Sequence, residues 1–303
     1  MDARESGDVM ATRSVDAALK TATVFTVLAL GFAVIYWIVV VLSRNGTLPF
    51  SMEHEGFGRA SLAGNVVWLV FSNFGPALAA VIALALCRGR DALVELGRSL
   101  IRWRVPRWLY SAAWFNLVLN AAVVATGYAT GTMHFDASAF VPLKFLLFFF
   151  VMAAIDGPLG EEIGWRGVLL PELMRRTSPL AAALVVGVVW YAWHVPLYAA
   201  EDKLPGLGEH VFFLYTCLAL SVIFTWFFLK SNASTFLMIY VHDASNYATF
   251  LRAKLFPKDA TSPWPLAVYA GLLLVLACAA AIALARSNGA RSADRGLRAG
   301  DVR

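Results

Sequence analysis

The chain is 303 residues long, and 59% of its residues are hydrophobic while only 15% are charged. A soluble domain of this length seldom has so few charges, whereas a bundle of membrane helices commonly does, and the mean hydropathy of +0.66 agrees. The net charge of +5 does not indicate a nucleic-acid partner, because the basic residues stand in short segments between apolar runs. The three cysteines lie far apart in apolar runs, so neither a disulfide framework nor a CxxC site is expected.

The apolar runs predict an all-α fold, a polytopic membrane helix bundle of about eight transmembrane helices, since about 20 apolar residues cross a bilayer. We expect a polar tail at residues 1–20, a single membrane domain at 21–285 and a basic, disordered tail at 286–303. The predicted spans are 21–42, 62–87, 108–130, 140–176, 180–198, 211–229, 233–250 and 264–285. Pro76 is expected to kink the second span, and Gly157–Pro158 the fourth, which is otherwise one long helix.

Basic residues are unevenly distributed between the two ends of the predicted spans. With eight spans, most of them fall on the side of both termini, together with the arginine-rich segment 88–107 and the turn at Thr177. The positive-inside rule then predicts a multi-pass protein of the cell inner (cytoplasmic) membrane with both termini in the cytoplasm. Part of segment 88–107 has apolar residues at helical spacing and is expected to lie on the membrane surface.

Three charged residues interrupt the fourth predicted span, and each costs about 2.5–3.5 kcal/mol at the centre of a membrane helix. They are Glu161, Glu162 and Arg166. Glu162 and Arg166 are four residues apart, so they share a helix face and can form an ion pair. That pair is either purely structural or part of a site. Glu161 points about 100° away and has no local cation, which leaves its carboxylate available for another role.

Two more polar clusters lie in apolar spans: Trp190 with His194 in the fifth, and His242 with Asn246 in the seventh. A single histidine in an apolar helix is more often a packing residue than a catalytic one. Depth in the membrane favours a site, however. At 1.5 Å per residue, Glu161 and His194 both lie roughly 23–24 Å from the turn that joins their helices, and a modest tilt brings the seventh span level with them.

This set of side chains supports one kind of chemistry. A carboxylate and an imidazole can activate water, either as a general base or by holding a divalent metal. Histidine and asparagine can donate hydrogen bonds to an oxyanion, and an arginine can keep a carboxylate ionised. The sequence contains no HExxH or GxSxG motif. It therefore predicts a peptide-bond hydrolase without a covalent nucleophile.

These residues resemble the CAAX-processing and bacteriocin-processing (CPBP, or Abi) intramembrane metalloproteases, which are related to the type II CAAX prenyl endopeptidases. The first family motif, EExxxR, matches the three charged residues of the fourth span. The second, FxxxH, matches at His194, with Trp190 in place of phenylalanine, which we interpret as a conservative change. The third, HxxxN, matches at His242 and Asn246. The motifs lie within residues 140–250, and the other spans carry no comparable signature.

The resemblance implies a glutamate-dependent endopeptidase that hydrolyses a peptide bond of a membrane-associated or prenylated protein or peptide. Glu161 and His194 would activate the water, Glu162 and Arg166 would orient the site, and the third-motif pair would bind the oxyanion. The implied partners are membrane lipid and a lipidated or membrane-associated substrate, with no nucleic acid.

Several alternatives stay open from the sequence. The water is either free or bound to a divalent metal such as zinc, for which Glu161, His194 and His242 are the candidate ligands. The same fold could also serve as a non-proteolytic scaffold or immunity factor, although the intact motifs argue against this. Buried glutamate and histidine also carry protons in transporters, but no inverted repeat typical of transporters is visible.

Overall fold

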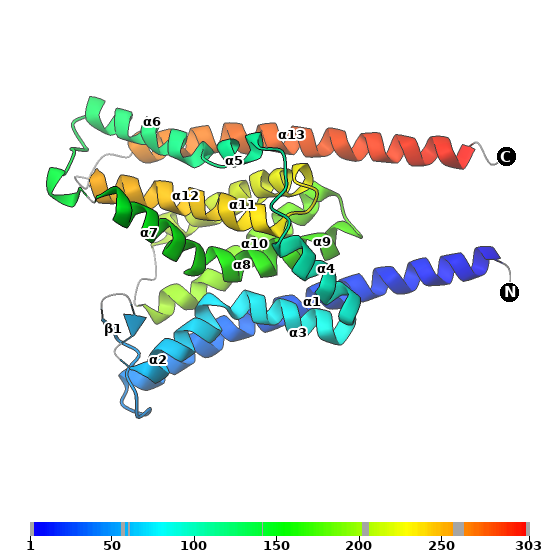
Figure 1. Ribbon diagram of the computed structural model, residues 1–303, viewed down its shortest axis with the longest axis horizontal. Coiled ribbons are helices and arrows are strands. Elements are labelled where there is room, and N and C mark those ends of the chain that lie inside the picture. Colours follow the sequence, from blue (N-terminus) through cyan, green and yellow to red (C-terminus); the bar gives the residue numbers. More distant parts are fainter. Residues whose placement is uncertain are drawn as a thin grey trace.

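The computed structural model describes residues 3–55, 58–59, 61–140, 142–201, 206–256 and 264–300, and it is a bundle of helices (Figure 1). The α-helices are α1 (Ala3–Arg44), α2 (Leu62–Val67), α3 (Gly75–Cys87), α4 (Arg90–Leu100), α5 (Trp108–Ala112), α6 (Phe115–Ala129), α7 (Leu143–Ile155), α8 (Pro158–Gly164), α9 (Leu170–Met174), α10 (Pro179–Ala200), α11 (Leu207–Lys230), α12 (Thr235–Leu255) and α13 (Trp264–Gly300). Shorter segments are the π-helical η1 (Trp68–Asn73) and η3 (Trp165–Leu169) and the 3₁₀ turn η2 (Ala137–Ala139). The two-residue strands β1 (His54–Glu55) and β2 (Gly58–Arg59) pair antiparallel after α1. The predicted all-α membrane bundle is thereby confirmed.

The number of spans differs from the expected eight. Five helices of the described chain are long and apolar enough to cross a membrane. They are Asp16–Arg44, Trp108–Ala129, Pro179–Ala200, Leu207–Lys230 and Trp264–Arg286. The helix pair Leu62–Asn73 and Gly75–Cys87, bent by 61°, makes a sixth if it is counted as one span. The predicted fourth and seventh spans fall outside this set, so the count of eight is not confirmed. The fourth and seventh spans carry most of the predicted site residues.

The fourth predicted span is two helices rather than one kinked helix. α7 ends at Ile155 and α8 begins at Pro158. Between them Gly157 has φ = 122°, a conformation that residues with a Cβ rarely adopt, and proline then starts the next helix favourably. In the second span, the break falls at Phe74, with Pro76 in the first turn of α3, so the predicted proline-associated bend is present.

The two breaks lie against each other and set the position of α8. Asn73 donates through Nδ2 to Asp156 Oδ1 (3.2 Å) and accepts from the backbone N–H of Gly157 (3.0 Å). A Cβ at Gly160 would lie 2.2 Å from the Asn73 carbonyl oxygen, and one at Gly164 would lie 2.7 Å from Pro76 Cβ. Because both positions are glycine, α8 packs closely against the bent second span. This contact holds the glutamates at a fixed depth in the bundle.

Two expectations about the ends of the chain need correction or extension. α13 continues to Gly300, so the tail 286–303, expected to be disordered, is helical through Gly300; extending an existing helix avoids the cost of nucleation. α1 likewise begins at Ala3, within the predicted polar tail. The start of α1 and the end of α13 lie at the same end of the bundle, near α4 and α9 (Figure 1).

The arginine-rich segment forms the helix α4. The hydroxyl of Ser99 in α4 lies 2.9 Å from the hydroxyl of Thr235, so α4 packs on the bundle.

Candidate active site

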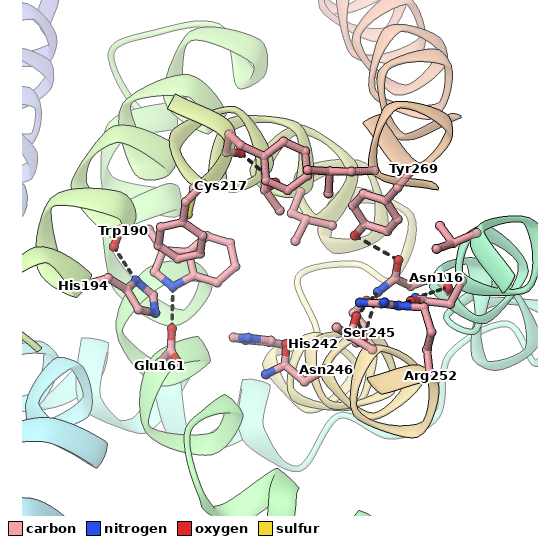
Figure 2. A pocket seen from close by; sticks show the side chains of 18 of the residues that line it. Asn116, Glu161, Trp190, His194, Cys217, His242, Ser245, Asn246, Arg252 and Tyr269 are labelled. Carbon is pink, nitrogen blue, oxygen red and sulfur yellow. Dashed lines mark hydrogen bonds between the residues drawn. The ribbon is translucent and has the colours of Figure 1, made fainter. Parts of the chain in front are cut away.

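Four of the six predicted site residues line one pocket with a volume of 420 Å³. Glu161 comes from α8, His194 from α10, and His242 and Asn246 from α12. Figure 2 shows Glu161 and His194 on one side of this space and the two α12 residues across from them. The structure therefore brings together, from three helices, the side chains that the depth argument placed at one level.

Glu161 is buried, with 6% of its surface exposed. Its Oε2 atom accepts hydrogen bonds from the indole N–H of Trp165 (3.2 Å) and, at shorter distance, from that of Trp190. No lysine or arginine of the described chain forms an ion pair with it. Its Oε1 atom has no hydrogen-bond partner among the described residues. One oxygen is thus held by two neutral donors, and the other is left for a ligand in the pocket.

Trp190 has a larger role than the sequence suggested. We interpreted it as a conservative replacement for the phenylalanine of FxxxH. Its indole N–H donates to the Glu161 carboxylate, which a phenylalanine cannot do. Its ring also lies 5.2 Å from the His242 ring and 5.0 Å from the Arg166 guanidinium carbon, centroid distances in both cases. Trp190 therefore contacts each part of the site.

Glu162 and Arg166 lie behind the pocket and are fully buried, with 0% exposure. Arg166 Nη1 donates to Glu162 Oε1 at 2.7 Å, which confirms the ion pair predicted from the four-residue spacing. The same Oε1 atom lies 2.8 Å from Nδ1 of His242, a third partner that the spacing does not predict. Arg166 Nη2 bonds to Ser221, and the guanidinium stacks over Phe224 at 4.8 Å. The pair therefore connects α8 to α12 and fixes the His242 ring.

The hydrogen bonds also determine which histidine nitrogens face the pocket. His194 Nδ1 lies 2.9 Å from the Trp190 carbonyl oxygen, which can only accept, so Nδ1 carries the hydrogen. His242 Nδ1 donates to a carboxylate that is also paired with an arginine. In the neutral form of each ring, Nε2 is therefore an acceptor. His242 can donate from Nε2, as an oxyanion ligand must, only as an imidazolium.

The three candidate metal ligands predicted from the sequence, Glu161, His194 and His242, all line the pocket. Within the part of the chain that the structure describes, no group of three or more His, Cys, Asp and Glu side chains is placed to hold a metal ion. The Nδ1 bonds of His194 and His242 do resemble the second-shell bonds of metal-ligating histidines. However, Oε2 of Glu161 is already occupied by two indole donors.

A second polar group, which sequence reasoning missed, lines the same pocket. It contains Asn116 and Asn120 of α6, Arg252 of α12 and Tyr269 of α13. Arg252 Nε donates to Asn120 Oδ1 (2.7 Å), and the Tyr269 hydroxyl donates to Asn116 Oδ1 (3.1 Å). The available signals were the four-residue spacing of the asparagines and an arginine two residues after the end of the seventh predicted span. Neither feature by itself shows that the asparagines and the arginine lie on helices that face each other.

Known proteins resemble the part of the chain that holds the site. Residues 142–248 match the family described as Type II CAAX prenyl endopeptidase Rce1-like. A relative, CAAX prenyl protease 2 of Methanococcus maripaludis, is 34% identical over 109 residues, which are 34% of this chain and 38% of the relative. The chain thus covers little more than a third of the relative's length. All six predicted site residues and the helices α8, α10 and α11 fall within the matched segment.

The matched segment contains all three motifs from which the resemblance was inferred. The motifs follow one another in the expected order along the chain. The apolar helices that surround them make the chain a multi-pass membrane protein. Residues 142–248 of this chain are thus similar to the Rce1-like, type II CAAX prenyl endopeptidases.

Proposed function

We propose that this chain is an intramembrane endopeptidase in which Glu161 and His194 activate a water molecule. The observation that carries the proposal is that one free carboxylate oxygen and one imidazole acceptor, from two different helices, line a single pocket in an apolar bundle. Such a pair can hold a water and accept its proton. Neither serine nor cysteine has to act as nucleophile.

The proposed reaction uses each residue at a stated atom. A water bound between Glu161 Oε1 and His194 Nε2 gives up a proton, and its oxygen attacks the peptide carbonyl. The resulting oxyanion accepts hydrogen bonds from the Asn246 side-chain amide and from Nε2 of His242 as an imidazolium. Collapse of the tetrahedral intermediate breaks the C–N bond, and the proton passes from the glutamate–histidine pair to the leaving amine. Glu162 and Arg166 act through His242, whose ring they position.

The substrate we propose is a membrane-associated or lipidated peptide, with a prenylated protein C-terminus as the class suggested by the relative's name. Apolar side chains of the pocket support this, among them Val123, Phe212, Phe213 and Leu220. We also propose the orientation predicted from the basic residues, with both termini in the cytoplasm. The pocket then extends toward the opposite side, because Tyr198, Arg252 and Pro265 at its far end belong to the helix ends away from the termini.

The variant Glu161→Gln tests the proposal, because it keeps the shape of the side chain but removes the base. The assay is cleavage of an S-farnesylated fluorogenic peptide by protein reconstituted in lipid vesicles. We expect turnover to fall roughly 10²- to 10⁴-fold with an unchanged melting temperature. The matched control is Glu53→Gln, since Glu53 lies exposed in the loop after α1, and its turnover should equal that of the wild type.

A Glu161→Gln protein that keeps more than about a tenth of wild-type turnover would exclude Glu161 as the base. The same assay also tests whether the attacking water is bound to a metal ion. Activity that disappears after chelation and returns on addition of zinc would replace free water with metal-bound water, while leaving the roles of Asn246 and Arg166 unchanged.

A further inference from the structure

The segment that joins α4 to α5 presents apolar and cationic side chains side by side on the molecular surface. Ile101, Trp103 and Trp108 are 73%, 57% and 51% exposed, which is unusual for side chains of this size outside a membrane. Arg104 and Arg107 stand between the two tryptophans in the sequence and are exposed as well. We call these five residues the anchor surface.

The anchor surface lies where the chain enters the membrane. The candidate span Trp108–Ala129 begins at its last residue, so its other four members precede that span by at most seven residues. Figure 1 shows α4 and the segment that follows it at the end of the bundle toward the two chain termini. Tryptophan is enriched at the level of the lipid headgroups, because its ring is apolar while its N–H is polar. The exposed apolar side chains are therefore at the depth of the headgroup boundary.

Hydrogen bonds to the bundle hold the backbone of this segment in place. Arg102 Nη1 donates to the backbone carbonyl of Ala233 at 3.2 Å, and the Arg102 carbonyl accepts from the Ser234 hydroxyl at 2.6 Å. The next carbonyl, that of Trp103, accepts from the Tyr110 hydroxyl at 2.6 Å. Arg102 thus ties the segment to the turn between α11 and α12. The anchor surface is preorganised, so little conformational entropy is lost when it binds a ligand.

The two arginines of the anchor surface have no counter-ion within the part of the chain that the structure describes. Arg102 pairs with Glu95 at 2.9 Å, whereas neither Arg104 nor Arg107 forms an ion pair or a hydrogen bond there. The guanidinium carbon of Arg104 lies 5.1 Å from the centroid of the Trp103 ring, a contact that leaves its N–H donors available. A guanidinium fork matches the oxygens of a phosphate. The segment 88–107 as a whole has six arginines and two acidic residues, so it attracts anions.

We propose that the anchor surface is a binding site for the headgroup of an anionic phospholipid. Arg104 and Arg107 contact the phosphate, while Ile101 and the two tryptophans lie against the glycerol and the upper part of the acyl chains. The exposed apolar side chains favour a lipid over a nucleic acid, which would leave them in water. This inference concerns lipid recognition at the surface of the bundle and does not depend on peptide cleavage.

Binding of single lipid molecules to the delipidated, full-length protein in detergent tests the proposal. The probes are phosphatidylglycerol, which carries a net negative charge, and phosphatidylcholine with the same acyl chains, which is zwitterionic. A titration followed by native mass spectrometry gives the Kd of the first bound molecule of each lipid. Each basic residue near an anionic lipid contributes about 1 kcal/mol. For two arginines we therefore expect phosphatidylglycerol to bind roughly 30-fold more tightly than phosphatidylcholine.

Variants of the two arginines locate the binding site. In Arg104→Gln/Arg107→Gln the two lipids should bind with Kd values within about twofold of each other, because the charge that distinguishes them is gone. Arg104→Lys/Arg107→Lys should recover part of the preference, since it keeps the charge but not the fork of donors. Lys254→Gln is the matched control. Lys254 is an exposed cation at the end of α12, and its loss should leave the full preference.

Equal affinity of the wild type for the two lipids would overturn the proposal, and this comparison needs no variant to fold. A preference that survives in the double glutamine variant, at an unchanged melting temperature, would place the lipid elsewhere on the protein.

Two competitors test the other possible occupants. Glycerophosphoglycerol has the headgroup without acyl chains, and a short oligonucleotide has phosphodiesters without a lipid. Displacement of phosphatidylglycerol by either one at an equal concentration would refute the assignment to a lipid. We expect neither to compete, because neither provides the apolar contacts with Ile101 and the tryptophans. Peptide cleavage enters none of these measurements, so they stand or fall independently of the proposed function.

Discussion

Replacing Arg166 by leucine should destabilise the protein strongly, because it removes the counter-ion of a fully buried carboxylate. Arg166 donates to Glu162 at 2.7 Å and to Ser221 at 3.3 Å, and its guanidinium lies over the rings of Trp190 and Phe224. Breaking a buried ion pair by removing one partner costs about 3–5 kcal/mol. Glu162 would keep its hydrogen bond from His242, so we expect a value of about 3 kcal/mol, near the lower end.

The double variant Glu162→Leu/Arg166→Leu makes the prediction specific to the ion pair. Exchanging a buried pair for apolar side chains is often close to neutral, since neither charge then needs to be desolvated. In this protein, however, His242 Nδ1 would lose its acceptor, and an unsatisfied buried donor costs about 1–3 kcal/mol. The free energy of unfolding of the double variant should therefore lie between that of the wild type and that of Arg166→Leu. It should remain inactive, because nothing then orients His242.

The free energy of unfolding can be measured by denaturant titration in detergent micelles, with tryptophan fluorescence as the signal. Trp165 and Trp190 lie within the site and report directly on its packing. Arg98→Leu is the control, because Arg98 is an exposed arginine in a weak 3.8 Å pair with Glu95, and its change should stay within about 0.5 kcal/mol. Equal free energies for Arg166→Leu and the double variant would show that the ion pair does not carry this stability.

Two further predictions concern the site and its orientation. Trp190→Phe keeps an aromatic ring but removes the N–H that holds Glu161. Because a hydrogen bond to a charged group is worth about 1.5–3 kcal/mol, kcat should fall at least tenfold with little change in KM. An unchanged kcat would show that the indole does not position the carboxylate. In a cysteine-free background on intact cells, a membrane-impermeant thiol reagent should modify His134→Cys but not Thr177→Cys, both exposed positions in turns. The opposite pattern would refute the proposed orientation and turn the pocket toward the cytoplasm.

The sequence by itself determined the features that depend on local helix geometry. Hydropathy identified most of the membrane-embedded segments, and a spacing of four residues was enough to predict the Glu162–Arg166 pair. Counting residues from the turn at Thr177 predicted that Glu161 and His194 meet, because two helices of a hairpin rise at the same rate. The same local reasoning failed where a helix could stop or continue. The break at Gly157 and the helical tail after Ala285 both differ from the expected helix limits.

The tertiary structure alone decided which residues of different helices touch. The bonds from His242 to Glu162 and from Trp190 to Glu161 depend on the rotation of each helix about its axis, which residue spacing within one helix cannot specify. That rotation follows from close contacts between distant segments, such as Gly160 against the Asn73 carbonyl. Arg252 is part of the pocket for the same reason: only the packing of α6 beside α12 brings Asn120 to its Nε and leaves its other nitrogens open to the cavity.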